Sequence, residues 1–144
     1  MNLEVRLMKR IYSVVVFGNE ENDIMLVLKF TNQKFQSLSD FLNSEVHNFY
    51  PHIYKELEAV VTGQKESSGF GGNMLNIDIG KKETEVYYQM DDESLGSPCF
   101  IPTNELYKLV LEWKEMEKNA QRGRYFSSYP RGLKMNKQID VFGL

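Results

Sequence analysis

The sequence predicts an α+β fold, with an antiparallel sheet from two hairpins and two main helices in the order β-β-α-β-β-α. Two observations predict it. Short β-branched and aromatic runs occur in pairs around polar turns, which is typical of β-hairpins. A longer stretch follows each pair, with apolar residues every three or four positions, which is typical of a helix with one buried face.

The first expected hairpin joins residues 11–17 (IYSVVVF) to residues 24–30 (IMLVLKF) through the polar segment 18–23. Both runs are apolar on both faces in places. These strands are therefore expected at the centre of a sheet or under a helix.

The first main helix is expected between Ser37 and Gly63. Ser37 or Ser39 can cap its start, because a hydroxyl accepts a hydrogen bond from a free backbone N–H group there, and Gly63 suits its end. Pro51 lies inside this stretch, where it removes a backbone hydrogen bond and clashes with the preceding turn. We therefore expect a kink or two abutting helices near Tyr50, with Pro51 opening the second. The apolar stripe consists of Leu42, Val46, Phe49, Ile53, Leu57 and Val60.

The second expected hairpin joins residues 74–79 (MLNIDI) to residues 84–90 (TEVYYQM) around Gly80-Lys81-Lys82, after a glycine-rich connector, 65–73. The second main helix is expected to begin near Thr103. Its stripe consists of Leu106, Leu109, Val110, Trp113, Met116 and Ala120. Residues 1–123 are predicted to form one domain. Residues 124–144 are predicted to form an irregular basic tail, in which QIDVFGL (138–144) can add an edge strand.

The net charge of −3 hides an asymmetry. Residues 122–144 carry five basic residues and one acidic residue, a net +4, which leaves the first 121 residues with 12 basic and 19 acidic residues, a net −7. An acidic body repels nucleic-acid phosphate and attracts basic proteins. The sequence has one cysteine and no apolar run near the ~20 residues of a membrane span, which predicts a cytoplasmic protein without a membrane partner.

The run Asp91, Asp92 and Glu93 is the most concentrated charge in the chain. Three adjacent acids lack the alternating oxygen ligands of a calcium loop. They are also poorly placed for acid–base catalysis, which needs carboxylates in different environments. The two leading interpretations are a solvated turn and a surface for a basic partner.

No catalytic residue, metal site or cofactor site is predicted. His47 and His52 are five apart and lack the spacing of a zinc helix, and no motif around Cys99 supports a reactive thiol. Tyr87 and Tyr88 lie among Glu83, Glu85 and the acidic run, whereas single-strand nucleic-acid binders place basic residues between their aromatics. Tyrosines beside carboxylates favour a protein interface.

Three stretches resemble small acidic immunity proteins of bacterial toxin–immunity systems, above all those of contact-dependent and wall-associated polymorphic toxins. They are FLNSEVHNFYPHIYKELEAVVTG (41–63), EVYYQMDDES (85–94) and FIPTNELYKLVLEWKEMEKN (100–119), and the resemblance covers residues 10–121. The basic tail departs from this type.

The resemblance implies a non-enzymatic protein that binds a cognate toxin domain in the producer's cytoplasm and blocks it. A nuclease toxin is basic because it binds phosphate, so an acidic inhibitor can mimic its substrate. No binding residue is transferred by motif, because such interfaces diverge. Charge alone selects Asp91, Asp92, Glu93, Glu83 and Glu85 as partner-binding residues, with Tyr87 and Tyr88 as aromatic anchors.

Two alternatives remain at the level of sequence. One is a metal-dependent hydrolase that uses Asp91, Asp92, Glu93 and a histidine. The other is a non-catalytic interaction or regulatory domain that self-associates through residues 125–144. The toxin's identity and the oligomeric state are left open.

Overall fold

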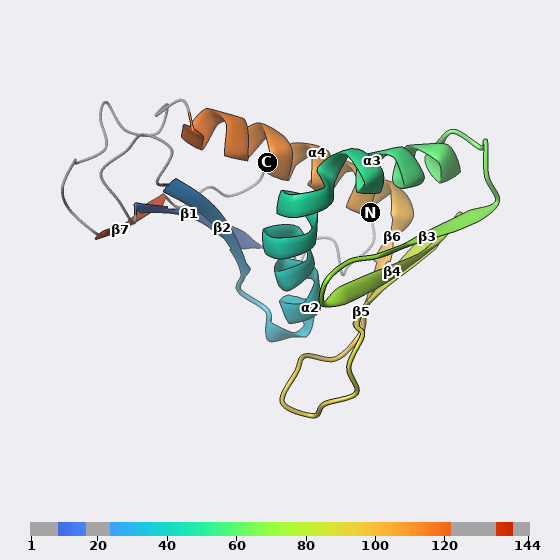
Figure 1. The fold of residues 1–144 in the computed structure, drawn as a ribbon, viewed down its shortest axis with the longest axis horizontal. Helices are drawn as coiled ribbons and strands as arrows, with labels where there is room; N and C mark the ends of the chain where they lie inside the picture. Colours follow the sequence, from blue (N-terminus) through green and yellow to red (C-terminus); the bar gives the residue numbers. More distant parts are fainter. Residues whose placement is uncertain (1–8, 17–23, 122–134, 140–144) are drawn as a thin grey trace.

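The computed structural model describes residues 9–16, 24–121 and 135–139, which form an α+β arrangement of two antiparallel sheets and several helices (Figure 1). The first sheet has the strand order β2-β1-β7, with β1 at Arg10–Val16, β2 at Ile24–Phe30 and β7 at Met135–Ile139. The second has the order β3-β4-β5-β6. Its strands are Ser67–Gly71, Leu75–Gly80, Glu83–Tyr88 and Cys99–Pro102.

The α+β class and both predicted hairpins are confirmed, as β1–β2 and β4–β5. The hairpins belong to separate sheets, however. The Asn43 side chain accepts from the Leu28 N–H (2.8 Å) and donates to the Leu28 carbonyl (2.8 Å), to which Ser39 Oγ also donates (2.7 Å). These bonds occupy the backbone of β2 where a further strand would pair, because each backbone group needs a partner when buried.

The expected glycine-rich connector contains a strand, β3, and β6 comes directly before the second helix. Both were missed by the sequence interpretation. Ser67–Gly71 is rich in glycine, which is depleted in strands, and Cys99–Pro102 has only four residues. Pairing with β4 and β5 holds these two segments in extended form.

The first helical region begins earlier than predicted and runs through η1 (Gln33–Phe35), α2 (Gln36–Asp40), the π-helical η2 (Phe41–Val46) and α3 (His47–Val61). The capping prediction for Ser37 and Ser39 is wrong. Asn32 caps this region by accepting from the Lys34 N–H (3.1 Å), and both serines are buried within α2.

The kink predicted before Pro51 is confirmed. Phe49 has φ −129° and ψ 28°, outside the helical range, so Pro51 lies in the first turn of a second helical segment. Gly63 follows α3 with φ +84°, a left-handed conformation that ends the helix and that glycine adopts without steric cost.

The core lies between the helices and the inner faces of both sheets, with α2 and η2 between the two sheets in Figure 1. The predicted stripe of α4 (Thr103–Gln121) is buried in full, and Trp113 has no exposed surface. Phe49 is the one member of the first stripe that is only partly buried.

A polar network attaches α4 to β1. Arg10 donates two hydrogen bonds to Glu112, from Nε (2.7 Å) and Nη2 (2.6 Å), and the Tyr12 hydroxyl donates to Glu112 Oε1 (2.6 Å). Burial and the bond to Glu112 raise the pKa of Tyr12. The two-pronged geometry sets both the position and the rotation of α4 against the sheet.

The tail contributes β7, which pairs with β1 from Tyr12↔Ile139 to Val16↔Met135. The predicted boundary between residues 123 and 124 falls outside the described residues, as do residues 140–144 of the predicted edge strand. Among the described helices, none combines the length and apolar character needed to cross a bilayer.

Candidate protein-interaction surface

The acidic loop, residues 89–98 between β5 and β6, projects away from the body of the protein in Figure 1. Asp91, Asp92 and Glu93 are all exposed at its start. The Ser94 N–H donates to Asp92 Oδ1 (2.9 Å), and hydrogen bonds from Ser94 lower the pKa of Asp92. The hydrogen bond from the Ser94 N–H gives the start of the loop a defined turn at Asp92.

The strand β5 displays the other predicted acidic residues on one face. Its side chains alternate, so that Thr84 and Val86 are buried while Glu83, Glu85 and Tyr87 point outward. Helices α2, α3 and α4 contact the sheet through its buried side chains. We call the opposite side, formed by the outward residues of β3–β6, the open face.

The strand register aligns Asp78, Glu85 and Phe100 side by side across the open face. Asp78 lies opposite Glu85, and Glu85 lies opposite Phe100. Sequence reasoning did not select Asp78 or Phe100 as a site residue. The sequence pattern does not show that these residues lie side by side, because the register across β4, β5 and β6 is set by pairing between strands.

The side chains of the two predicted tyrosine anchors lie on opposite sides of the sheet. The Tyr87 hydroxyl donates to Asp78 Oδ1 (3.3 Å) on the open face. Tyr88 is part-buried on the inner side, where its hydroxyl donates to the Asp40 carboxylate of α2. Burial and this bond raise the pKa of Tyr88. Tyr87 is therefore available to a partner of the open face, whereas Tyr88 fastens β5 to α2.

The acidic loop begins beside the open face, where Gln89 Nε2 donates to Asn76 Oδ1 (2.9 Å), and its second half lies on the inner side of the sheet. Asp91 follows Glu85 by six residues, a chain length of up to about 20 Å. Gly96, in the second half of the loop, lies next to Gln36 of α2 and Tyr88, on the inner side of β5. The seven predicted partner-binding residues thus divide into loop, open face and inner side, and their binding role stays a prediction.

The open face has a shallow hollow of about 470 Å³, lined in part by Ser67, Gly80, Glu83, Glu85 and Phe100. Three of its outward positions are glycines: Gly69, Gly71 and Gly80. The β3 side of the face therefore carries few side chains of its own, and the side chains of Asp78 and Asn76 lie beside Gly69 and Gly71.

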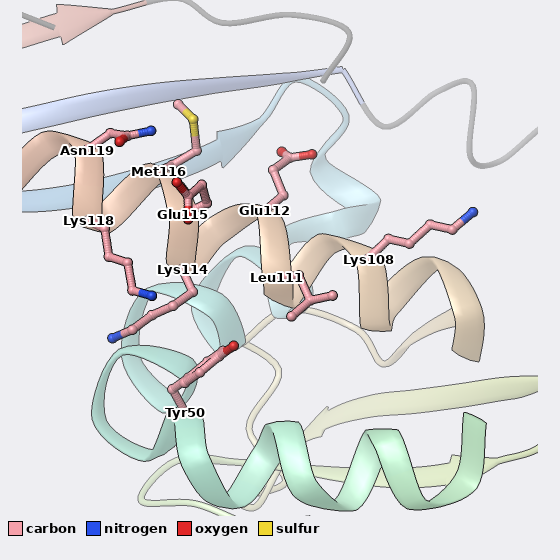
Figure 2. A pocket seen from close by; sticks show the side chains of 9 residues that line it. All are labelled: Tyr50, Lys108, Leu111, Glu112, Lys114, Glu115, Met116, Lys118 and Asn119. Atoms are coloured by element: carbon pink, nitrogen blue, oxygen red, sulfur yellow. The ribbon is translucent and has the colours of Figure 1, made fainter. Parts of the chain in front are cut away.

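A second concave region, of about 810 Å³, follows the outer surface of α4 beside Tyr50 (Figure 2). Lys114 and Lys118 extend toward Tyr50, and Leu111 lines the groove between α3 and α4. Lys114 Nζ is already 2.9 Å from Glu117 Oε1 and 5.2 Å from the Tyr50 ring centre. This groove carries both signs of charge, largely paired within the protein, and it lacks the acidic character of the open face.

The histidines do not build a metal site with the acidic loop. His47 Nδ1 lies 2.7 Å from Glu117 Oε2, and no group of three potential metal-binding side chains occurs in the described ranges. Cys99 is buried on the inner side of β6.

Comparison with known proteins gives one relative of direct interest. No family model matches the sequence, and no solved structure matches it. A curated protein of Bacillus cereus named immunity protein is 29% identical over 117 residues, which are 81% of this chain and 96% of that protein. The chain is similar to an immunity protein. The name mentions neither a polymorphic-toxin system nor a nuclease.

Proposed function

We propose that this protein is an immunity protein, which binds a cognate bacterial toxin domain and blocks its activity without catalysis. The observation that carries the proposal is the similarity to the Bacillus cereus immunity protein, which extends over 96% of that protein. A likeness over 117 residues is far longer than a single motif.

We further propose that the toxin belongs to a contact-dependent or wall-associated polymorphic system and is a basic nuclease, met in the producer's cytoplasm. The net −7 of residues 1–121 supports this, together with the exposed carboxylates of the loop and of the open face. Opposite charges raise the association rate by steering the two proteins together, and they match a cleft built for phosphate.

The first experiment is co-purification of this protein with the toxin domain encoded beside its gene, followed by cleavage assays of that toxin on plasmid DNA and total tRNA. We expect a stable complex and loss of cleavage at equimolar protein. The association rate should fall about tenfold or more between 50 mM and 500 mM salt.

Charge reversal tests the role of the acidic surface separately from the immunity function. Asp91→Lys with Asp92→Lys tests the loop, and Glu115→Lys, an exposed charge reversal on α4, is the control outside the acidic surface. Absence of binding by the unaltered protein would overturn the immunity function. Tight binding that none of the acidic substitutions in the loop or the open face weakens would keep that function and refute the acidic surface.

A further inference from the structure

The side chain of Phe100 is half exposed (50%) although it lies within a β-strand and beside the hollow of the open face. A single exposed apolar residue is ordinary on a protein surface. Phe100 differs because its cross-strand neighbour is Glu85, and the hollow beside it has room for a side chain of another protein. An aromatic beside a pocket is the usual form of an interface anchor.

Two carboxylates next to Phe100 face each other across neighbouring strands, and the Tyr87 hydroxyl donates to one of them, Asp78 Oδ1 (3.3 Å). Asp78 and Glu85 are directly opposite each other on neighbouring antiparallel strands. Like charges in this position are mutually destabilising. Within the described ranges, neither Asp78 nor Glu85 forms an ion pair. Lys81, at the nearby turn, pairs with Glu66 instead (3.0 Å). A cationic side chain from a partner would relieve this repulsion.

The glycines of the open face also support an approach by a partner. Glycine weakens a strand, and within strands it often marks a place where another molecule approaches the backbone closely. Gly69 lies opposite Asp78, and Gly80 lies opposite Ser67. The glycines add no side chain beside the hollow, which Asp78 and Glu85 both line, so a partner can come within contact distance of both carboxylates.

We propose that the toxin docks on the open face, with Phe100 as the apolar anchor and with Asp78 and Glu85 receiving arginine or lysine side chains. This inference rests on the proposed immunity function and names the surface and the partner chemistry. An arginine fits best, because its planar group can bond a carboxylate while it stacks on an aromatic ring. The acidic loop then acts in steering rather than at the centre of the contact.

The test measures the dissociation constant for the toxin domain encoded beside the gene, by titration calorimetry, together with the melting temperature of each variant. Phe100→Ala should weaken binding about 30-fold or more, the scale of an interface anchor, whereas Leu111→Ala should stay within about twofold. Leu111 is the matched control because it is a partly exposed apolar residue (37%) on α4.

The double variant Asp78→Thr with Glu85→Thr gives a distinctive pair of readouts. Binding should weaken about 30-fold or more, while the melting temperature of the free protein rises by about 1 to 3 °C, because the like-charge repulsion is gone and threonine suits a strand. Ser67→Trp, an exposed change that fills the hollow without altering charge, should also block binding.

Three outcomes would overturn the inference. If these variants bind within about twofold of the unaltered protein while Asp91→Lys with Asp92→Lys does not, the toxin contacts the loop and the immunity function stands. If the double variant loses binding and also melts at a lower temperature, the carboxylates have a structural role. If the unaltered protein does not bind the toxin, the immunity function fails, and the inference fails with it.

Discussion

Glu45 is a fully buried carboxylate in η2 that lies against the turn between β3 and β4. Its Oε1 accepts from the Asn73 N–H (3.2 Å), and Oε2 has no hydrogen-bond partner in the described structure. A Cβ atom at Gly72 would stand 1.3 Å from Oε2. The residue at position 72 must therefore be glycine as long as Glu45 occupies its present place.

Gly72→Ala should lower the free energy of unfolding by about 1–3 kcal/mol, the usual cost of forcing extra volume into a packed site. In a Glu45→Ala background the same change should cost less than about 1 kcal/mol, because the clashing carboxylate is absent. Urea unfolding of both single variants and the double variant measures the coupling. Strictly additive effects would contradict the contact.

At the scale of elements, Pro51 shows how a residue that breaks one helix can begin another. The non-helical backbone at Phe49 interrupts the hydrogen-bond ladder just before Pro51. The missing N–H group of proline then lies in a first turn, where an N–H has no intrahelical acceptor.

Pro51→Ala should therefore change the free energy of unfolding by less than about 1 kcal/mol, against about 3 kcal/mol for a proline inside a continuous helix. The measurement is the urea midpoint, with Ala59→Pro, in the regular part of α3, as the comparison that should be severely destabilised. A stabilisation well above 1 kcal/mol in Pro51→Ala would show that the kink is imposed by the proline rather than by packing.

Elements with strong periodicity were predicted well, and elements that depend on pairing were not. The stripe of α4 and the strands β1, β2, β4 and β5 follow from apolar patterns that need no knowledge of neighbours. The strands β3 and β6 carry weak local preferences, and pairing with β4 and β5 holds them in extended form. The start of the helical region was misassigned, because Ser37 and Ser39 have good capping side chains but are buried by the fold.

At the scale of the whole molecule, the stability should fall at alkaline pH because phenol groups are buried with carboxylate partners. Burial raises the pKa of Tyr12 and of Tyr88, and each hydroxyl donates to a carboxylate. A raised folded-state pKa means that the unfolded chain loses its proton first. The stabilising contribution is complete below about pH 10, the unfolded value, and is lost as the pH rises beyond it.

In Tyr12→Phe, the free energy of unfolding that is lost between pH 8 and pH 11 should be smaller by about 1 kcal/mol. The variant should nevertheless be less stable than the unaltered protein at pH 8, because the hydrogen bond from the Tyr12 hydroxyl to Glu112 is gone. Urea midpoints at pH 8, 10 and 11 measure it, with Tyr87→Phe on the open face as control. An unchanged slope above pH 10 in Tyr12→Phe would show that Tyr12 does not contribute to the alkaline loss.

The sequence by itself determined the α+β class, the two hairpins, the kink before Pro51 and the acidic character of the first 121 residues. These properties follow from local preferences, periodicity and composition, which are present before the chain folds. It also selected Glu83 and Glu85 by charge, but it did not establish that both lie on one face of a strand.

Only the tertiary structure decided which of these features lie together. The two hairpins lie in different sheets, with the Asn43 side chain bonded to the backbone of β2, and the register across β4, β5 and β6 aligns Asp78, Glu85 and Phe100 in one row. β5 and β6 are separated by the acidic loop and are joined by backbone hydrogen bonds. These bonds use N–H and C=O groups that nearly every residue has, so the sequence does not reveal which residues will pair. The candidate surface is therefore a product of pairing and of the helices that cover the opposite side of the sheet.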